Sequence, residues 1–129
     1  MLDHVGFAVS DIKRARAFYE KALAPLGITL IMEVGPDLTE AGGTALGFGS
    51  EGKPFFWIGD NERVGEGTHV AFTAKTRAEV HAFYDAALAA GGADNGAPGL
   101  RPHYHPDYYG GFVKDPDGVN VEAVCHSPE

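Results

Sequence analysis

The sequence has little cysteine, little positive charge and no long apolar run. Its single cysteine, Cys125, excludes an internal disulfide. It has no stretch of about 18 apolar residues and no basic-then-apolar N-terminus, so neither a membrane-spanning helix nor a secretory signal is expected. Only 10 lysines and arginines stand against 18 acidic residues, and the net charge of −8 disfavours nucleic acid and anionic membranes as partners. We therefore expect a cytoplasmic protein.

The length of 129 residues is that of a single domain, 1–129, which can bury a core without disulfide staples. Cys125 alternates with Val121 and Ala123 in an apolar segment, and this pattern predicts a small buried side chain. The alternative, a reactive thiol, has no cationic neighbour in the sequence to activate it.

The sequence repeats itself at a spacing of 65 residues. Residues 69–92 align without a gap on residues 4–27, with 10 identities in 24 positions. Self-similarity at a fixed long period predicts two copies of one supersecondary unit. Both copies begin with a histidine, His4 in the first and His69 in the second.

Each copy is predicted to be a strand followed by a helix. In residues 5–9 bulky apolar residues alternate with small ones, so His4 shares a face with small residues while the bulky face packs on the helix. Apolar residues at three- and four-residue steps predict a helix over 12–26, starting after Asp11. The second helix starts after Thr76 and ends at the glycine pair 91–92.

The remaining segments complete a βαβββ pattern in each half. Strands are predicted at 28–34, 44–49 and 54–59, and again at 108–114 and 119–125 around the turn 115–118. Residues 93–105 are predicted to be a loop, so the second strand of the second half is weak or irregular. The fold class is therefore α+β, with two βαβββ repeats at about 1–60 and 67–126 and a linker over 60–67.

Glu122 is the most informative polar residue. It lies in the middle of an apolar strand, where a carboxylate is costly unless it is paired or bound to a cation. The 65-residue shift places Trp57 at the equivalent position, so His4, Trp57, His69 and Glu122 are predicted to face one cleft. Two histidines and a carboxylate suit Fe2+ or Mn2+ and, less selectively, Zn2+, Ni2+ or Co2+. The alternatives are hydrogen-bonded surface histidines and a Glu122 that is paired with an arginine.

A second candidate region is the segment 101–109, with its two histidines and three tyrosines. His105, Tyr108 and Tyr109 are predicted to act as general acids or bases or as hydrogen-bond donors, since imidazole titrates near neutral pH. His103 is predicted to belong to the substrate pocket. The alternative is an ordinary aromatic surface loop.

Two further aromatic residues, Trp57 and Phe48, are predicted to line an apolar cleft beside the metal ligands. With His103 they would make up the substrate pocket. The alternative for both is simple core packing.

Three segments carry a resemblance to a known family: the opening DHVGFAVSD with its helix FYEKALAPLG, the second opening THVAFTAKT, and the ending DPDGVNVEAV. They resemble the vicinal oxygen chelate superfamily, which holds glyoxalase I, bleomycin-resistance proteins, extradiol dioxygenases and methylmalonyl-CoA epimerase. The resemblance covers essentially the whole chain. It implies that the paired units curl into a half-open barrel with helices outside and a divalent metal inside, held by His4, His69 and Glu122.

The resemblance also implies a function. Glyoxalase I-like members carry a second carboxylate where this sequence has Trp57, which disfavours glyoxalase I itself and leaves the ligand set typical of extradiol dioxygenases, although those chains are usually longer. We expect a small metal-dependent enzyme whose small-molecule substrate chelates the metal through adjacent oxygens, with dioxygenase or lyase/isomerase chemistry. The alternative is a non-catalytic ligand- or drug-binding protein of the bleomycin-resistance type. A homodimer is expected, with the metal site either within one chain or across the interface.

Overall fold

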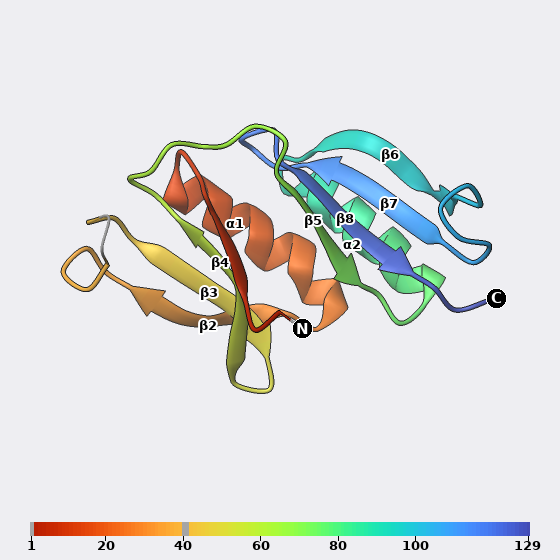
Figure 1. Ribbon diagram of the computed structural model, residues 1–129, viewed down its shortest axis with the longest axis horizontal. Coiled ribbons are helices and arrows are strands. Elements are labelled where there is room, and N and C mark those ends of the chain that lie inside the picture. Colours follow the sequence, from red (N-terminus) through yellow and green to blue (C-terminus); the bar gives the residue numbers. More distant parts are fainter. Residues whose placement is uncertain (1, 40–41) are drawn as a thin grey trace.

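The computed structural model describes residues 2–39 and 42–129. Its first half contains β1 (Val5–Ala8), α1 (Ile12–Leu23), the short 3-10 helix η1 (Ala24–Leu26), β2 (Thr29–Val34), β3 (Ala45–Ser50) and β4 (Lys53–Gly59). The second half contains β5 (His69–Thr73), α2 (Arg77–Ala89), β6 (Ala93–Leu100), β7 (Tyr109–Lys114) and β8 (Asn120–Cys125) (Figure 1). The predicted pair of βαβββ units is confirmed.

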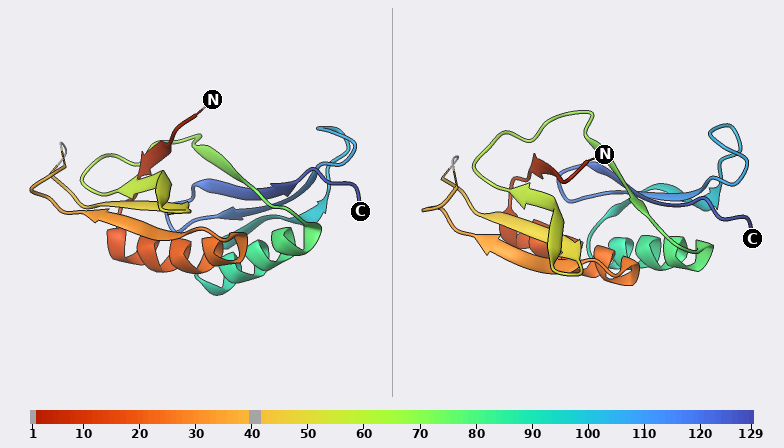
Figure 2. Two further views of the ribbon diagram at one scale, coloured as in Figure 1. Left: turned by 90° about the horizontal axis from the view of Figure 1, so that it is seen from below. Right: turned by 60° about the horizontal axis from the view of Figure 1, so that its bottom comes forward.

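Each unit forms its own four-stranded mixed sheet. The strand orders are β1-β4-β3-β2 and β5-β8-β7-β6, and in each sheet the first strand pairs in parallel with the last strand of its unit. Both helices lie on the same side of the molecule, which leaves the opposite face of each sheet without a helix (Figure 2). The described strands form two separate sheets and do not close into a barrel.

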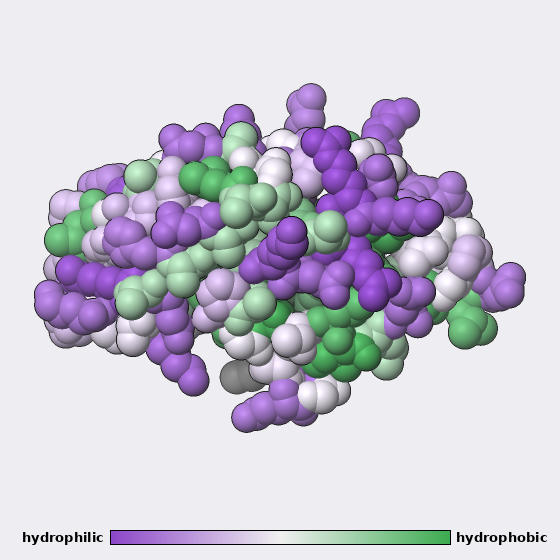
Figure 3. Space-filling model, turned by 180° about the vertical axis from the view of Figure 1, so that it is seen from behind, coloured by the Kyte–Doolittle hydropathy of each residue, from purple (hydrophilic) through white to green (hydrophobic). Residues whose placement is uncertain are grey.

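The helices begin where the sequence signals place them. The Asp11 side chain accepts hydrogen bonds from the first backbone N–H groups of α1, and Thr76 Oγ1 accepts one from the backbone N–H of Glu79 at 3.1 Å. The predicted helix over 12–26 is divided into α1 and η1 because Pro25 has no N–H for a regular helical bond. Hydrophilic residues cover most of the helical side (Figure 3). No helix in residues 2–39 or 42–129 is long and apolar enough to span a membrane.

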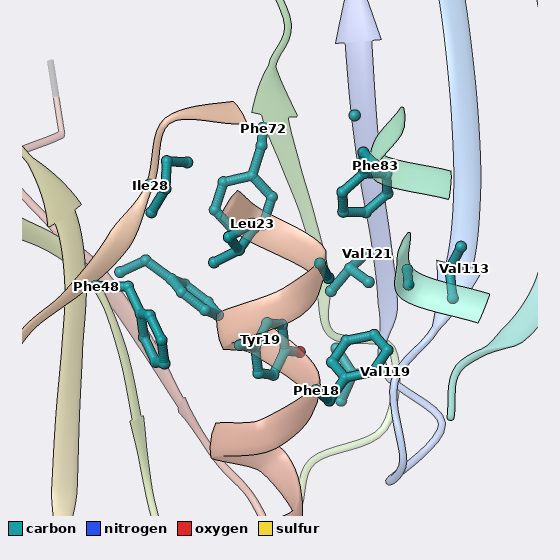
Figure 4. Packing of buried hydrophobic residues seen from close by; sticks show 14 of the residues in the cluster. Phe18, Tyr19, Leu23, Ile28, Phe48, Phe72, Phe83, Val113, Val119 and Val121 are labelled. Atoms are coloured by element: carbon teal, nitrogen blue, oxygen red, sulfur yellow. The ribbon is translucent and has the colours of Figure 1, made fainter. Parts of the chain in front are cut away.

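One hydrophobic core serves both units. Helix α1 lies between the two sheets, and its side chains Phe18, Tyr19 and Leu23 are fully buried (Figure 4). A Cβ atom at Gly92 of the second unit would lie 2.7 Å from the Phe18 ring, so glycine is required there for the two units to approach. Cys125 is fully buried in the same core, which confirms the prediction of a small buried side chain.

The turn 115–118 joins the two units. Asp115 is 4% exposed and accepts hydrogen bonds from the backbone N–H groups of Asp117 and Val119 and from the Tyr19 hydroxyl of α1 at 2.7 Å. Asp117 accepts from the backbone N–H of Ser10 at 3.0 Å and also from its hydroxyl. The turn was predicted from the sequence, whereas its hydrogen bonds to the first unit were not.

The contact between Tyr19 and Asp115 predicts a pH-dependent stability. Burial, and then the nearby Asp115 carboxylate, raise the pKa of Tyr19 well above its usual 10.0. Above that pH the unfolded chain ionises this tyrosine while the folded chain does not, so stability is lost as pH rises. We expect Tyr19 to lower the free energy of unfolding by about 1.4 kcal/mol for each pH unit above about pH 10. The variant Tyr19→Phe should lack this contribution.

Urea unfolding in steps from about pH 9 to about pH 11 measures this slope. The control is Tyr104→Phe, which should leave the slope unchanged because Tyr104 is 62% exposed. Equal slopes for the wild type and Tyr19→Phe would contradict the assignment.

The second unit departs from the sequence prediction at one element. Residues 93–105 were predicted to be a loop, but Ala93–Leu100 forms strand β6 and pairs with β7. Its register shifts twice, around Gly96, whose φ of 144° is accessible to glycine. The prediction that this strand is weak or irregular fits its shifted register, but its bounds could not be predicted because its backbone pairing to β7 does not require apolar alternation. Only the segment 101–108 remains as a loop.

Candidate metal and substrate site

The faces without helices carry two equivalent rows of side chains. Residues directly opposite each other in neighbouring strands point to the same face of a sheet. In the first sheet one such row is Gly6, Trp57, Gly47 and Met32, and in the second sheet it is Ala71, Glu122, Phe112 and Gly96. The 65-residue shift relates the first three pairs of these positions. The prediction that Trp57 and Glu122 occupy equivalent positions in the two repeats is therefore confirmed.

Glu122 lies at the centre of the second row. It is 1% exposed, and its Oε1 atom is 3.0 Å from Nε2 of His69. Its Oε2 atom accepts a short hydrogen bond from the Tyr108 hydroxyl. The Phe112 ring covers the same face, and its centroid lies 6.3 Å from that of the His69 imidazole, in a stacked arrangement. The pairing partner of the buried carboxylate is thus a histidine and not an arginine.

These residues form an open hollow of about 460 Å³, which we call the His69 half-site. Its lining consists of His69, Tyr104, Tyr108, Phe112, Asn120 and Glu122. Burial and the hydrogen bond to Glu122 raise the pKa of Tyr108 above its usual 10.0. The phenol therefore stays protonated at neutral pH and acts as a donor to Glu122, which makes a role as general base unsuitable for Tyr108.

The first sheet carries a corresponding Trp57 half-site, lined by Asp3, His4, Gly6, Lys53, Pro54 and Trp57. The indole lies over Gly47, where a Cβ atom would come within 2.8 Å of it. The His4 side chain is 60% exposed, and its Nδ1 atom is 2.8 Å from Asp3. The Lys53 ammonium, bonded to the same carboxylate at 2.8 Å, and then His4 lower the pKa of Asp3.

The predicted metal ligands are divided between the two half-sites. His69 and Glu122 lie side by side, whereas His4 belongs to the other half-site and pairs with Asp3. In the described part of the chain no group of three histidine, cysteine, aspartate or glutamate side chains could hold a metal ion. One copy of this chain therefore presents two of the three predicted ligands together.

A family model matches residues 1–123, nearly the whole chain and both half-sites, and describes the Glyoxalase/Bleomycin resistance protein/Dioxygenase superfamily. The chain belongs to this superfamily. The resemblance stated from the sequence motifs is thereby confirmed. Members of the superfamily commonly bind divalent metals. A comparison with curated protein sequences found no match.

Several solved structures have the same fold. A glyoxalase/bleomycin resistance protein from Albidiferax ferrireducens T118 is 25% identical, with a TM-score of 0.73 over 95% of this chain and 96% of that one. A Zea mays glyoxalase I mutant is 27% identical with a TM-score of 0.71, and this chain, aligned over 95% of its length, covers 46% of the maize chain. The fosfomycin resistance protein FosX from Listeria monocytogenes, at 19% identity and a TM-score of 0.66 over 97% of this chain and 90% of that one, shows the fold alone.

Two of the predicted site residues lie elsewhere in this superfamily member. Phe48 is fully buried against Tyr19 and Phe56, because it lies on the face of β3 that α1 covers; it belongs to the core instead of a pocket. Tyr109 points toward α2, with its hydroxyl 2.6 Å from Nε2 of His81. Successive residues of a strand point to opposite faces, so Tyr109 lies behind the sheet and away from Glu122.

The loop 101–108 brings the other predicted residues close to the His69 half-site. The ring centroids of His103 and Tyr104 are 4.1 Å apart, with the rings tilted, and those of Tyr104 and Tyr108 are 5.1 Å apart. The rings of His105 and Tyr108 both lie close to that of His126, at 5.5 and 5.2 Å. The loop therefore forms an aromatic rim beside the buried carboxylate.

Three residues that line the His69 half-site were not predicted as site residues from the sequence: Tyr104, Phe112 and Asn120. Phe112 had a usable signal, because the hairpin 108–125 places it directly opposite Glu122. Tyr104 belongs to the candidate segment 101–109, but no role was predicted for it, since its position depends on the conformation of the loop.

Proposed function

We propose that this chain is a small metal-dependent enzyme whose metal site is completed by a second copy of the chain. His69 and Glu122 of one copy and His4 of the other would hold a divalent metal ion. The observation that carries the proposal is a carboxylate that is 1% exposed in an apolar strand, with a histidine 3.0 Å away and no cationic lysine or arginine bound to it in the described residues. A buried carboxylate without such a partner is costly, and a divalent cation removes that cost.

The donor set fits a metal ion. Neutral imidazole and carboxylate are the ligands that Fe2+ and Mn2+ accept in sites with open positions, and Zn2+, Ni2+ or Co2+ could take the same set. When bound, the metal would supply Lewis-acid chemistry to a substrate that chelates it through two adjacent oxygens. The Tyr108 hydroxyl would orient Glu122 toward the ion, as hydrogen bonds from outside the ligand set do in other metal sites.

The proposed dimer would pair the two uncovered sheet faces. Met32 is 46% exposed on the first sheet and Tyr104 is 62% exposed beside the second, so a single copy leaves an apolar and an aromatic side chain exposed at these two faces. Around a two-fold axis the Trp57 half-site of each copy can face the His69 half-site of the other, which gives two equivalent sites. This arrangement uses all three predicted ligands, whereas one copy alone does not bring them together.

The other side chains would bind the substrate and move its proton. Trp57 and Phe112 would form opposite apolar walls that exclude water. Nδ1 of His105 accepts from the backbone N–H of Asp107 at 3.2 Å, so the neutral ring carries its proton on Nε2. His105 would therefore donate to a substrate oxygen from the rim.

A metal titration tests the proposal. We expect the wild-type protein to bind one Mn2+ or Fe2+ per chain, and His69→Ala to weaken binding by at least about 100-fold, because a direct ligand should matter more than the partners that orient it. His81→Ala is the matched control, since His81 contacts Tyr109 on the helical side. Metal content that is equal in wild type and His69→Ala, or absent in the reconstituted wild type, would contradict the proposal.

A second candidate is a binder of planar molecules that uses no metal. The observation that favours it is the Trp57 indole, which lies over Gly47 and lines a hollow of about 410 Å³. Planar ligands stack well on such a surface. The same titration separates the two candidates, because a binder of this kind would hold no metal in wild type or variants.

A further inference from the structure

Arg101 is a cation at the edge of the His69 half-site that the predicted site does not use. It follows strand β6, and its backbone N–H donates to the carbonyl of Tyr108 at 2.7 Å. This bond closes the loop 101–108 at its base. The backbone that carries the guanidinium is therefore held close to the residue that binds Glu122.

The side chain of Arg101 is held by specific contacts with β6 and β7. Its Nη2 atom donates to the carbonyl of Ala97 at 2.8 Å, and its Cζ atom lies 5.4 Å from the centre of the Phe112 ring. A Cβ atom at Gly99 would lie 3.0 Å from Nη1, and one at Gly96 would lie 3.3 Å from Nη2. The two glycines of β6 thus leave the space that the guanidinium occupies, and the cation–π contact holds it in one orientation.

In the sheet order, Phe112 of β7 lies between the glycines of β6 that adjoin this cation and Glu122 of β8. The same ring stacks on the His69 imidazole at 6.3 Å and lies directly opposite Glu122 in the strand register. The guanidinium is not among the groups that line the His69 half-site, but a molecule that extends from this half-site across the Phe112 ring would reach it.

The charge of Arg101 has no acidic partner in the described residues. The ion pairs found there involve Arg16, Lys53, His4 and His69, although the chain has 18 acidic side chains for 10 basic ones. A guanidinium has five N–H donors, and one bond to a neutral carbonyl leaves most of them for a ligand. Its planar fork suits the two oxygens of a carboxylate or a phosphate-type group.

We propose that Arg101 binds an anionic group of the substrate, either a carboxylate or a phosphate or phosphonate. This assignment rests on the proposed function, because it takes the His69 half-site as the place where the substrate binds. It narrows the substrate to an anion that carries an acidic group in addition to its two chelating oxygens.

The test uses the full-length protein without metal, so that its result does not depend on the metal site. Acetate and inorganic phosphate are titrated separately against chloride at constant ionic strength, and the backbone amide signals of Gly99, Gly110 and Phe112 are followed by NMR. We expect saturable shifts with at least one probe, and an affinity lowered by about tenfold or more in Arg101→Gln, since charge-assisted hydrogen bonds are lost. Binding of acetate alone indicates a carboxylate, and binding of phosphate alone indicates a phosphate or phosphonate.

Two variants serve as controls. Arg63→Gln removes an exposed cation of the linker and should leave the affinity unchanged. Arg101→Lys keeps the charge without the fork and should bind more weakly than wild type, with amide signals that remain those of a folded chain. Absence of saturable shifts with both probes, or equal affinity in wild type and Arg101→Gln, would overturn the assignment. Neither result would bear on metal binding, so the anion site at Arg101 and the proposed metal site can be refuted independently.

Discussion

Replacing Glu122 with glutamine is expected to remove metal binding while leaving the metal-free protein as stable as before. The amide has nearly the shape of the carboxylate and can still accept from the Tyr108 hydroxyl, but it is a far poorer ligand. The wild-type carboxylate is 1% exposed, so its burial has a desolvation cost that the neutral glutamine side chain avoids. We expect metal affinity to fall by at least about 100-fold and the free energy of unfolding to change by less than about 1 kcal/mol.

The chain contains a matched control for this substitution. Asp115 is the other buried acid of the described residues, and it serves the fold by accepting from two backbone N–H groups and from Tyr19. Asp115→Asn is expected to lower the free energy of unfolding by about 2 kcal/mol and to leave the metal affinity of the folded protein unchanged. Urea unfolding without metal and a Mn2+ titration measure both quantities. A large loss of stability in Glu122→Gln would instead make Glu122 a structural residue.

The repeat made much of the fold predictable from the sequence. A gapless alignment of 24 positions at a shift of 65 residues predicted that Trp57 is equivalent to Glu122, and the strand registers confirm that equivalence. The helix starts were predicted from the N-caps Asp11 and Thr76, because a short polar side chain before an apolar helical pattern accepts hydrogen bonds from the first free backbone N–H groups of the helix. These features depend on local chemistry or on the comparison of two halves of one chain.

The remaining features depend on contacts that no local pattern encodes. Strand β6 was predicted only as a weak or irregular strand without bounds, because glycines and a proline replace the usual alternation. Phe48 and Tyr109 were assigned to the site from their residue type, whereas the face of the strand on which they lie places them in the core and beside α2. Arg101 could not be selected from the sequence, because its significance comes from the ring of Phe112 and from the glycines beneath its guanidinium.

The second large effect is expected on the metal content of a mixed dimer, because His4 lies in the other half-site from His69 and Glu122. If the site is shared between copies, a dimer of one His4→Ala chain and one Glu122→Ala chain contains one site with both substitutions and one with neither. Co-expression of the two chains with different affinity tags allows this mixed dimer to be purified. It should bind about half of the metal of the wild-type dimer, while each variant alone should bind almost none.

Metal content of the purified mixed dimer is therefore the measurement that tests the shared site most directly. Light scattering on the same samples provides the mass of the assembly. A dimer mass with about half of the wild-type metal content is the predicted result. A monomer mass for the wild type, or a mixed dimer that binds no metal beside a wild type that does, would contradict a site built from two copies of the chain.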